Sequence, residues 1–434
     1  MKNTFRTIKI ALLTFCLGYS AQAQVPSPAP AQDHGIVLVG GTAHTGTGEV
    51  IENSAVAFNN GKLTFVGKSD DLGTSYSDYE KMDVSGKQVY PGLIILQSQL
   101  GLSEIDGVRA TVDNTEIGDF NPSVRSTIAY NTESEQIPVA RSNGIMLAQI
   151  IPQGGTISGL SSVMNMDAWN WEDAIYNADE GMWLTWPSYY SRRGYGSNAT
   201  MQENSNYASE VQALESIFSE AKKYKGAPAN SKLTAMQGLF DGTTILYIQA
   251  DYVKSVIESI RFAQKMGVKR IVLAGADEDA LLVKDFLKEN NIPVIVAPIH
   301  RLPKRKDSYT KAPYEMAARF HEAGILAALT YEGSTGSMNL PFVAGQGVPY
   351  GLTKEEALQT VTLNAAKILG IDDRAGSLEV GKDAHVVVSE GDLLDMRTNK
   401  VTQAFINGRD ISLDNKHKRL YRKFATRYGQ EIVE

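Results

Sequence analysis

Apolar and polar residues alternate in blocks along the chain, and the clearest block begins at a Pro-Gly break. After Pro91 and Gly92 comes the apolar run 93–96, and the polar residues Gln97 and Gln99 follow it. A turn signal before a short apolar run predicts a fully buried strand. Side chains two residues apart share a face of a strand. Both glutamines are therefore expected at its C-terminal end, pointing together into the mouth of an α/β barrel.

Strand and helix periods then alternate further along the chain. Strand-type runs occupy 144–151, 243–249, 269–274, 292–297 and 325–330, and helical spacing occupies 251–266, 276–290, 314–323 and 353–369. The last helix is expected to begin after Thr353, with Glu356 completing a capping box. Because strands that alternate with helices form parallel sheets, residues 91–373 are expected to form the barrel.

Both ends of the chain carry short strand-type runs separated by glycine turns. Such runs fill 35–89 and return at 376–409. Taken alone they predict a small β module. The prolines and small residues of 24–33 predict an extended linker before it, and 416–434 forms a C-terminal tail.

The N-terminus has the pattern of a secretory signal peptide. Lys2, Arg6 and Lys9 precede an apolar run over 10–19, and small residues at 21–23 have the spacing of a cleavage site. The run is too short for a membrane span, and no second span follows. We expect cleavage after Ala23 and a periplasmic or extracellular mature protein.

Cysteine content and net charge bear on disulfide bonds and on the class of partner. The single cysteine, Cys16, lies in the leader, so the mature chain is expected to rely on its hydrophobic core without disulfides. The formal net charge is −7, with no long basic run. This balance argues against nucleic acid as a partner.

Several phrases of the sequence together resemble the amidohydrolase superfamily. They are the Pro-Gly-Leu-Ile run at 91–94, the stretch 154–173, His300-Arg-Leu-Pro303, Asn339-Leu-Pro-Phe342, Leu363-Asn-Ala-Ala-Lys-Ile-Leu-Gly370 and the Gly-Ser-Leu-Glu-Val-Gly-Lys-Asp-Ala phrase at 376–384. The chain is most similar to the imidazolonepropionase-like branch, over nearly the whole mature chain. The resemblance implies an α/β fold, with a (β/α)8 TIM-type barrel over 91–373 and a small composite β-sandwich that joins 34–90 to 374–415.

In that superfamily the first barrel strand ends in His-x-His, and the two imidazoles hold a metal. Here these positions are Gln97 and Gln99, a further ligand position reads Gln249, and the next strand ends in Gly275. Glu332 falls where an Asp normally serves as base and ligand, and the bridging Lys or Glu is missing. An amide oxygen is a weak, neutral ligand for zinc-type ions. The resemblance thus implies vacated ligand positions and no cofactor, with a zinc-type metal only if hydrolysis is retained.

Further side chains are candidates for contact with a ligand. His300 follows a predicted strand end, so it either enters the mouth to contact a substrate or makes an ordinary loop hydrogen bond. Glu332 is either a lone general base, with a pKa raised by burial, or a salt-bridge partner. Tyr247 and Tyr331 join the three glutamines as substrate-binding or vacated ligand positions.

A stretch rich in aromatic residues begins within 154–173 and continues to Tyr190. It contains Trp169, Trp171, Trp183, Trp186, Tyr189 and Tyr190. These rings could wall a pocket, and core packing or an oligomer contact explains them equally well.

Three functions stay open, because fold alone does not decide function. The first is a metal-depleted relative that binds a small molecule or acts as a subunit, in a homo-oligomer or beside an active paralogue. The second is an active hydrolase of amide or cyclic C–N bonds that uses Glu332 and His300 with an atypical metal or none. The third is a structural envelope protein. Metal binding lowers the pKa of water to about 7, and no residue set in the sequence replaces that effect, so we favour the first.

Overall fold

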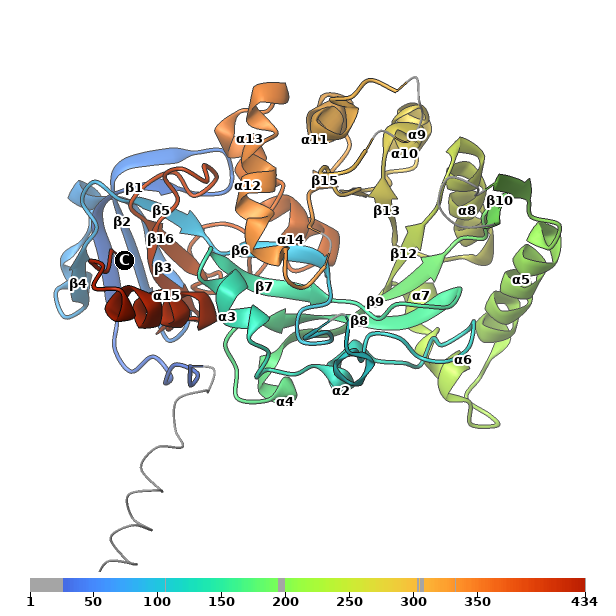
Figure 1. Cartoon of the computed structure of the whole chain (residues 1–434), viewed down its shortest axis with the longest axis horizontal. Coiled ribbons are helices and arrows are strands. Elements are labelled where there is room, and N and C mark those ends of the chain that lie inside the picture. Colours follow the sequence, from blue (N-terminus) through green and yellow to red (C-terminus); the bar gives the residue numbers. More distant parts are fainter. Residues whose placement is uncertain are drawn as a thin grey trace, which may run out of the picture.

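This computed structural model describes residues 26–105, 107–193, 200–302, 304, 308–331 and 333–433. The leader, with Cys16 and the expected cleavage site, lies outside these residues, and so does Glu332. Two sheets lie side by side, and helices pack around the larger one (Figure 1). None of the described helices is long and apolar enough to cross a bilayer.

The smaller sheet is built from both ends of the chain. Its strands are β1 (Ile36–His44), β2 (Val50–Asn59), β3 (Lys62–Lys68), β4 (Glu80–Asp83), β5 (Gln88–Pro91), β16 (Val386–Ser389), β17 (Val401–Ile406) and β18 (Arg409–Asp410). Their order is β18-β17-β16-β5-β1-β2-β3, with β4 beside β1. Antiparallel pairing of β5 with β16 joins the two ends, from Pro91 opposite Val386 to Gln88 opposite Ser389.

This sheet folds over an apolar core of its own. An isolated bridge between Lys62 and Asp383 brings the free edge of β3 back to the segment before β16. Inside the fold, the rings of Phe58 and Phe405 lie 4.8 Å apart, and both are fully buried. The expected composite β-sandwich is confirmed.

The larger sheet curls into a half-barrel of eight strands. They are β6 (Leu93–Ser98), β7 (Ile145–Ile150), β8 (Ile157–Asn165), β9 (Ile175–Thr185), β12 (Ile245–Gln249), β13 (Ile271–Ala276), β14 (Val294–Val296) and β15 (Ala327–Ala328), neighbours in that order. All pairs are parallel except those of β8, which runs antiparallel to β7 and β9. The TIM-type barrel fold is confirmed, with one reversed strand in place of a helical crossover.

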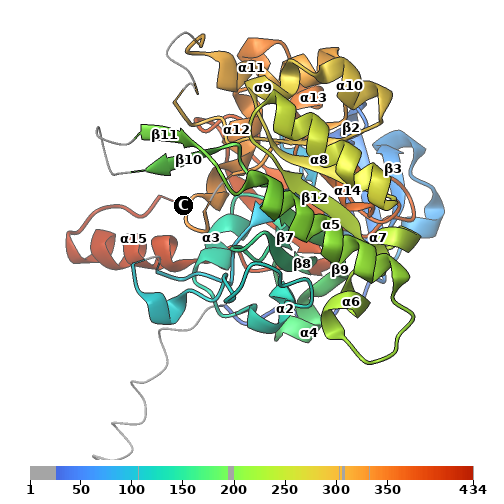
Figure 2. The same cartoon turned by 90° about the vertical axis from the view of Figure 1, so that its right-hand side faces the viewer.

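Helices pack around the half-barrel, and the last helix, α15, juts out to one side of it (Figure 2). They are α2 (Ser126–Ala129), α3 (Gln136–Arg141), α4 (Trp171–Ala174), α5 (Tyr207–Lys223), α6 (Ser231–Ala235), α7 (Gly238–Asp241), α8 (Val253–Met266), α9 (Glu278–Leu281), α10 (Lys284–Glu289), α11 (Ala312–Glu322), α12 (Leu340–Gly345), α13 (Lys354–Gln359), α14 (Leu363–Leu369) and α15 (Lys416–Arg427). A separate two-stranded ribbon joins β10 (Tyr190–Arg193) to β11 (Thr200–Glu203).

Two predicted helices are each interrupted. The expected helix 276–290 divides into α9 and α10, and the expected helix 353–369 divides into α13 and α14. Thr353 does cap α13 and forms the predicted capping box with Glu356. The prediction of one continuous helix over 353–369 was wrong, because the backbone at 360–362 makes tertiary hydrogen bonds that a continuous helix would not allow.

Those hydrogen bonds close the gap between the first and last strands of the half-barrel. The N–H of Ile94 in β6 donates to the Val361 carbonyl at 2.8 Å, and the N–H of Leu329, just after β15, donates to the Thr360 carbonyl at 3.1 Å. The Thr330 hydroxyl also donates to the Leu96 carbonyl. The break between α13 and α14 therefore forms the seam of the barrel.

Candidate functional site

The end of β6 holds the first two candidate residues in an irregular backbone. Gln97 has a φ of +56°, and the pairing of β6 with β7 shifts register between Ile95 and Ser98. The strand ends at Ser98. Because extended geometry stops here, the strict alternation expected to place Gln97 and Gln99 on one face does not continue through Gln99.

Both glutamines are engaged with neighbouring amides. The main-chain N–H of Gln97 donates to Gln149 Oε1 at 3.1 Å. Gln99 Oε1 accepts from Asn114 Nδ2 at 2.6 Å. The third glutamine, Gln249 at the end of β12, accepts at Oε1 from the Thr185 hydroxyl at 3.3 Å. These three hydrogen bonds therefore already occupy polar groups at the carboxyl end of the sheet.

A fully enclosed carboxyl group lies deeper in the half-barrel. Glu180 is 4% exposed. Its Oε1 accepts from Gln149 Nε2 at 2.8 Å and from the Ser161 hydroxyl at 2.5 Å, and its Oε2 accepts from the Tyr247 hydroxyl at 2.9 Å. Three neutral donors from β7, β8 and β12 thus converge on one acid from β9.

An irregularity in β9 turns Glu180 toward these donors. Between the pairs Ser161 with Gly181 and Val163 with Asn177 the register shifts, and Asp179 has a φ of +51°. The Asp179 N–H donates to the Ser162 hydroxyl oxygen at 2.8 Å. A bulge of this kind re-aims a side chain. Sequence reasoning missed Glu180, and the only signal was an acidic residue inside an otherwise strand-forming stretch.

Burial raises the pKa of Glu180, and the hydrogen bonds from Ser161, Gln149 and Tyr247 offset part of that effect. The pKa of Tyr247 is also raised, first by burial and then by the Glu180 charge. The Tyr247 ring has room because residue 181 is glycine, where a Cβ would lie 2.2 Å from the ring. This cluster joins four strands, β7, β8, β9 and β12.

His300 and Tyr331 do come together at the rim. The centroids of their rings lie 6.1 Å apart, and His300 Nε2 is 2.9 Å from Gln346 Oε1. Tyr314 lies 6.2 Å from His300 and stacks on Tyr350 at 5.6 Å. We call His300, Tyr314, Tyr331 and Tyr350 the rim cluster. The placement of Glu332 relative to it lies outside the described residues.

The aromatic stretch divides between core and surface. Trp183, in β9, is 2% exposed and stacks on Tyr247 at 4.7 Å, and Trp186 is buried against Phe262. Trp169 is 65% exposed. Core packing therefore accounts for two of these tryptophans.

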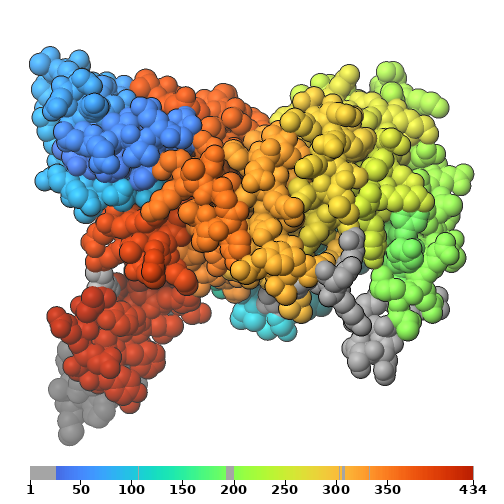
Figure 3. Space-filling view, turned by 90° about the horizontal axis from the view of Figure 1, so that it is seen from above, coloured from blue at the N-terminus to red at the C-terminus, as the bar shows by residue number. Residues whose placement is uncertain are grey.

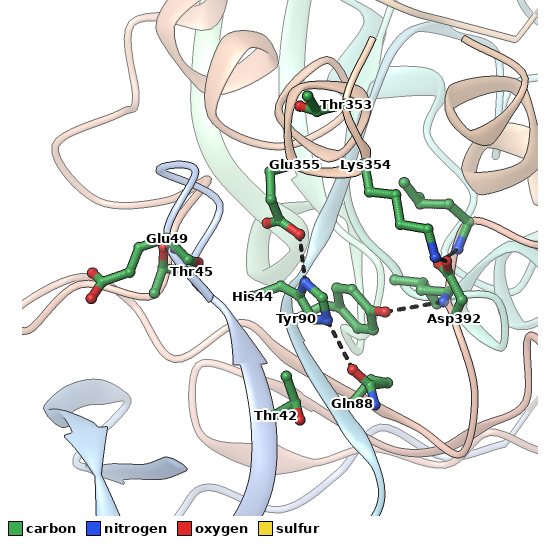
Figure 4. Close-up of polar contacts among 12 residues, drawn as sticks. Thr42, His44, Thr45, Glu49, Gln88, Tyr90, Thr353, Lys354, Glu355 and Asp392 are labelled. Carbon is green, nitrogen blue, oxygen red and sulfur yellow. Dashed lines mark hydrogen bonds and ion pairs between the residues drawn. The ribbon is translucent and has the colours of Figure 1, made fainter. Parts of the chain in front are cut away.

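A second polar cluster lies where the composite sheet meets α13 (Figure 4). His44 Nδ1 is 2.6 Å from Glu355 Oε1, and its Nε2 is 2.9 Å from Gln88 Oε1. Burial of the ring opposes protonation, but the hydrogen bonds to Glu355 and Gln88 outweigh it and raise the pKa of His44. Its ring stacks on Tyr90 at 4.5 Å.

A shallow groove runs beside this cluster. One cavity of about 220 Å³ touches His44, and a neighbouring cavity of about 470 Å³ shares Lys354 and Asp392 with it. Lys354 Nζ and Asp392 Oδ2 lie 2.7 Å apart and neutralise each other. Because Lys354 and Asp392 are paired, together they add no net charge to the groove.

A protein metal site needs several ligand side chains close together. Within the ranges that the structure describes, no three His, Cys, Asp or Glu side chains gather closely enough to share an ion. The candidate positions at the carboxyl end offer amide oxygens and, at Gly275, no side chain. This end of the sheet can donate and accept hydrogen bonds from a polar molecule.

Sequence comparison assigns the half-barrel and its composite sheet to a protein family. The profile of the amidohydrolase family matches residues 191–411. This chain belongs to the amidohydrolase family.

Individual relatives agree with that assignment. The imidazolonepropionase of Erwinia tasmaniensis is 23% identical over 379 residues, which is 80% of this chain and 89% of the relative. That of Shewanella baltica strain OS185 is 31% identical over 183 residues, 41% of this chain and 38% of the relative. The resemblance to the imidazolonepropionase-like branch is confirmed.

A solved structure supports the fold. The amidohydrolase from Thermotoga maritima superposes with a TM-score of 0.73 at 22% identity, over 86% of this chain and 99% of that structure. At this identity the likeness concerns architecture, and the chemistry must be argued from the residues of this chain.

Proposed function

We propose that this protein is an amidohydrolase-family member with a degenerate metal site, which binds a small polar molecule at the barrel mouth and has weak or no catalytic activity. One observation carries the proposal. Gln99 and Gln249, at positions where the family places metal ligands, already use their side-chain oxygens to accept hydrogen bonds from Asn114 and Thr185.

The donor set also argues against a zinc-type centre. Zinc sites in proteins use three or four imidazole, thiolate or carboxylate ligands. Amide oxygens carry no charge and have too little affinity to replace them. Three glutamines and Gly275 therefore do not fit such an ion, even with Glu332 as a single carboxylate.

Binding is a function that amides and aromatic rings can perform. The glutamines can both donate and accept, and the rim cluster supplies flat apolar surfaces beside the imidazole of His300. Such a subunit would act alone, as a homo-oligomer, or with an active paralogue. With its leader pattern at 1–23, we place it in the periplasm or outside the cell.

A second candidate function is an active hydrolase of C–N bonds other than peptide bonds. It is favoured by the imidazolonepropionase names of the relatives and by the exposed His300 at the rim. In that case Glu332 would be the general base and His300 would contact the substrate.

Metal analysis of the purified protein separates the two functions. A degenerate site predicts well under one equivalent of zinc, iron or manganese, before and after dialysis against a chelator. One equivalent that survives dialysis would overturn the proposal and make the hydrolase the leading candidate. Hydrolysis of cyclic amides, abolished by Glu332→Gln without loss of folding, would support the second function even in the absence of metal.

A further inference from the structure

The C-terminal helix α15 contacts the rest of the protein through one face only. Ala425 on that face is buried. Arg419 Nη2 reaches both oxygens of Glu135 at 2.9 Å, and Arg422 Nη2 lies 2.5 Å from Asp414. Asn415, buried just before the helix, accepts from the Lys418 N–H and so caps it. The helix is therefore fixed in place and not a loose tail.

The opposite face of α15 is exposed and carries large apolar side chains, with His417 among them. Its large side chains are Leu420, Tyr421, Phe424 and Tyr428, and at a helical period of 3.6 residues they fall on one side. We call this set the outer face. Phe424 is 48% exposed and Tyr428 68%. A soluble surface normally shows such residues singly, and a contiguous patch marks a binding surface.

The end of the chain extends the outer face. The Val433 N–H donates to the Tyr421 hydroxyl oxygen at 3.1 Å, so the last residues return alongside the helix. Ile432 and Val433 are both exposed there. Figure 3 shows α15 as a dark red protrusion at the edge of the molecule, where a flat surface could reach it.

Positive charges border the outer face. Lys416, Lys423 and Arg427 are exposed, and none has an ion-pair partner among the described residues. The Lys423 ammonium lies 6.0 Å from the Phe424 ring, and the Arg427 guanidinium lies equally far from the Tyr428 ring. The helix contains no Asp or Glu, although the chain as a whole has a formal charge of −7.

We propose that the outer face of α15 binds the surface of an anionic phospholipid bilayer. Exposed apolar and aromatic side chains bordered by lysine and arginine are what an interfacial helix uses, with the rings in the headgroup region and the cations on lipid phosphates. We propose peripheral association, since no described helix could cross the bilayer.

Charge decides between this occupant and a second copy of the chain. In a two-fold symmetric dimer each outer face would meet itself. The three unpaired cations of each helix would then face those of the other, and the one described acid that returns alongside α15, Glu431, is outnumbered three to one, which is unfavourable. An anionic lipid surface instead neutralises all three cations.

Vesicle flotation tests the proposal. The protein starting at Gln24 is compared on vesicles of pure phosphatidylcholine and on vesicles with roughly one third phosphatidylglycerol. This start removes the apolar N-terminal run, which would itself enter lipid, and keeps every described residue. We expect binding to the anionic vesicles only, weakening as salt rises and the Debye length shrinks.

Two variants separate the apolar and the charged contributions. Leu420→Ser with Phe424→Ser should abolish flotation. Lys416→Ala with Lys423→Ala and Arg427→Ala should weaken it at least about tenfold, because each cation near an anionic surface contributes about fivefold. One matched control is Val380→Ser with Met396→Ser, two apolar residues elsewhere that are more exposed than Leu420 and Phe424. The other is Lys68→Ala with Lys81→Ala and Lys269→Ala, three exposed lysines. Both controls should float like the parent.

Three results would overturn the proposal. They are equal binding to neutral and anionic vesicles, equal loss in the control variants, and no binding at low salt. A concentration-dependent dimer that Leu420→Ser with Phe424→Ser dissolves would assign the outer face to self-association instead. Unchanged thermal unfolding of each variant shows that a loss of binding is not a loss of fold.

Discussion

The phenol ring of Tyr247 lies flat against the indole of Trp183, with centroids 4.7 Å apart and planes 7° from parallel. This stack directs the Tyr247 hydroxyl to Glu180 instead of the barrel mouth. Tyr247 therefore lies in the interior, on the strand where the family is expected to carry a metal ligand. Its hydrogen bond ties the buried Glu180 carboxyl group to the packed core.

The charge of Glu180 should make stability depend on pH. Its folded pKa is raised above the ordinary 4.5, so its contribution is fully present below that pH and is lost as pH rises through the folded pKa. Glu180→Gln removes this loss. We expect the variant to gain stability relative to the parent as pH rises above 4.5, measured by urea unfolding. The exposed Glu220→Gln should show no such trend, and an equal trend in both variants would refute the assignment.

The glycine beneath the Tyr247 ring should not tolerate a methyl group. A Cβ at residue 181 would lie 2.2 Å from the ring, so Gly181→Ala must displace the stack. Overpacking of a core costs about 1–3 kcal/mol. Gly73→Ala is the control, because its Cβ meets only the Ser75 hydroxyl, at 3.8 Å. If thermal unfolding shows the two variants to be equally stable, the stack is looser than described.

The His44 and Glu355 pair should stabilise the protein at acid pH. The folded pKa of His44 is raised, so its contribution is full below the ordinary value of 6.5 and is lost as pH rises through the folded pKa. His44→Asn should therefore destabilise most below pH 6.5 and progressively less at alkaline pH. Unfolding of Glu355→Gln should follow the same curve, whereas the exposed His417→Asn should match the parent throughout. A His44→Asn defect that is constant with pH would mean that packing on Tyr90 carries the effect.

Restoring imidazoles tests the degenerate metal site directly. If the aligned positions converge, Gln97→His with Gln99→His and Gln249→His should bind zinc, since three imidazoles form a sufficient set with one carboxylate. Zinc at a hundredfold excess over its Kd should then stabilise the triple variant by about 2.7 kcal/mol, seen as a higher Tm.

The parent is the control for that experiment, and its Tm should not respond to zinc. We expect no recovered turnover, because the groups that orient ligands are not restored. Equal shifts in both proteins, or none in either, would show that the three positions do not converge. The irregular backbone at Gln97 makes this a demanding test.

The parts of the fold that were predictable are those that local pattern determines. The apolar run at 145–150 and the helix Val253–Met266 follow from spacing, and the capping box at Thr353 follows from two residue types three apart. The break at 360–362 could not be predicted, because hydrogen bonds from Ile94 and Leu329 create it.

The candidate site shows the same division. The proximity of His300 to Tyr331 follows from their place after neighbouring strands. Glu180 was missed because its direction depends on a bulge that only pairing with β8 produces. The positive φ at Gln97 likewise lies where the pairing of β6 with β7 shifts register, which the local sequence does not reveal.

The seam at Thr360 and Val361 bears on how the chain can be assembled during synthesis. The first strand of the half-barrel is joined to the last only by residues made after β15, and β5 gains its second neighbour only when β16 emerges. Contacts so distant in sequence form late. The chain before β15 must therefore leave the ribosome with an open sheet edge, and the newly made protein stays unclosed until residues 329–389 are available.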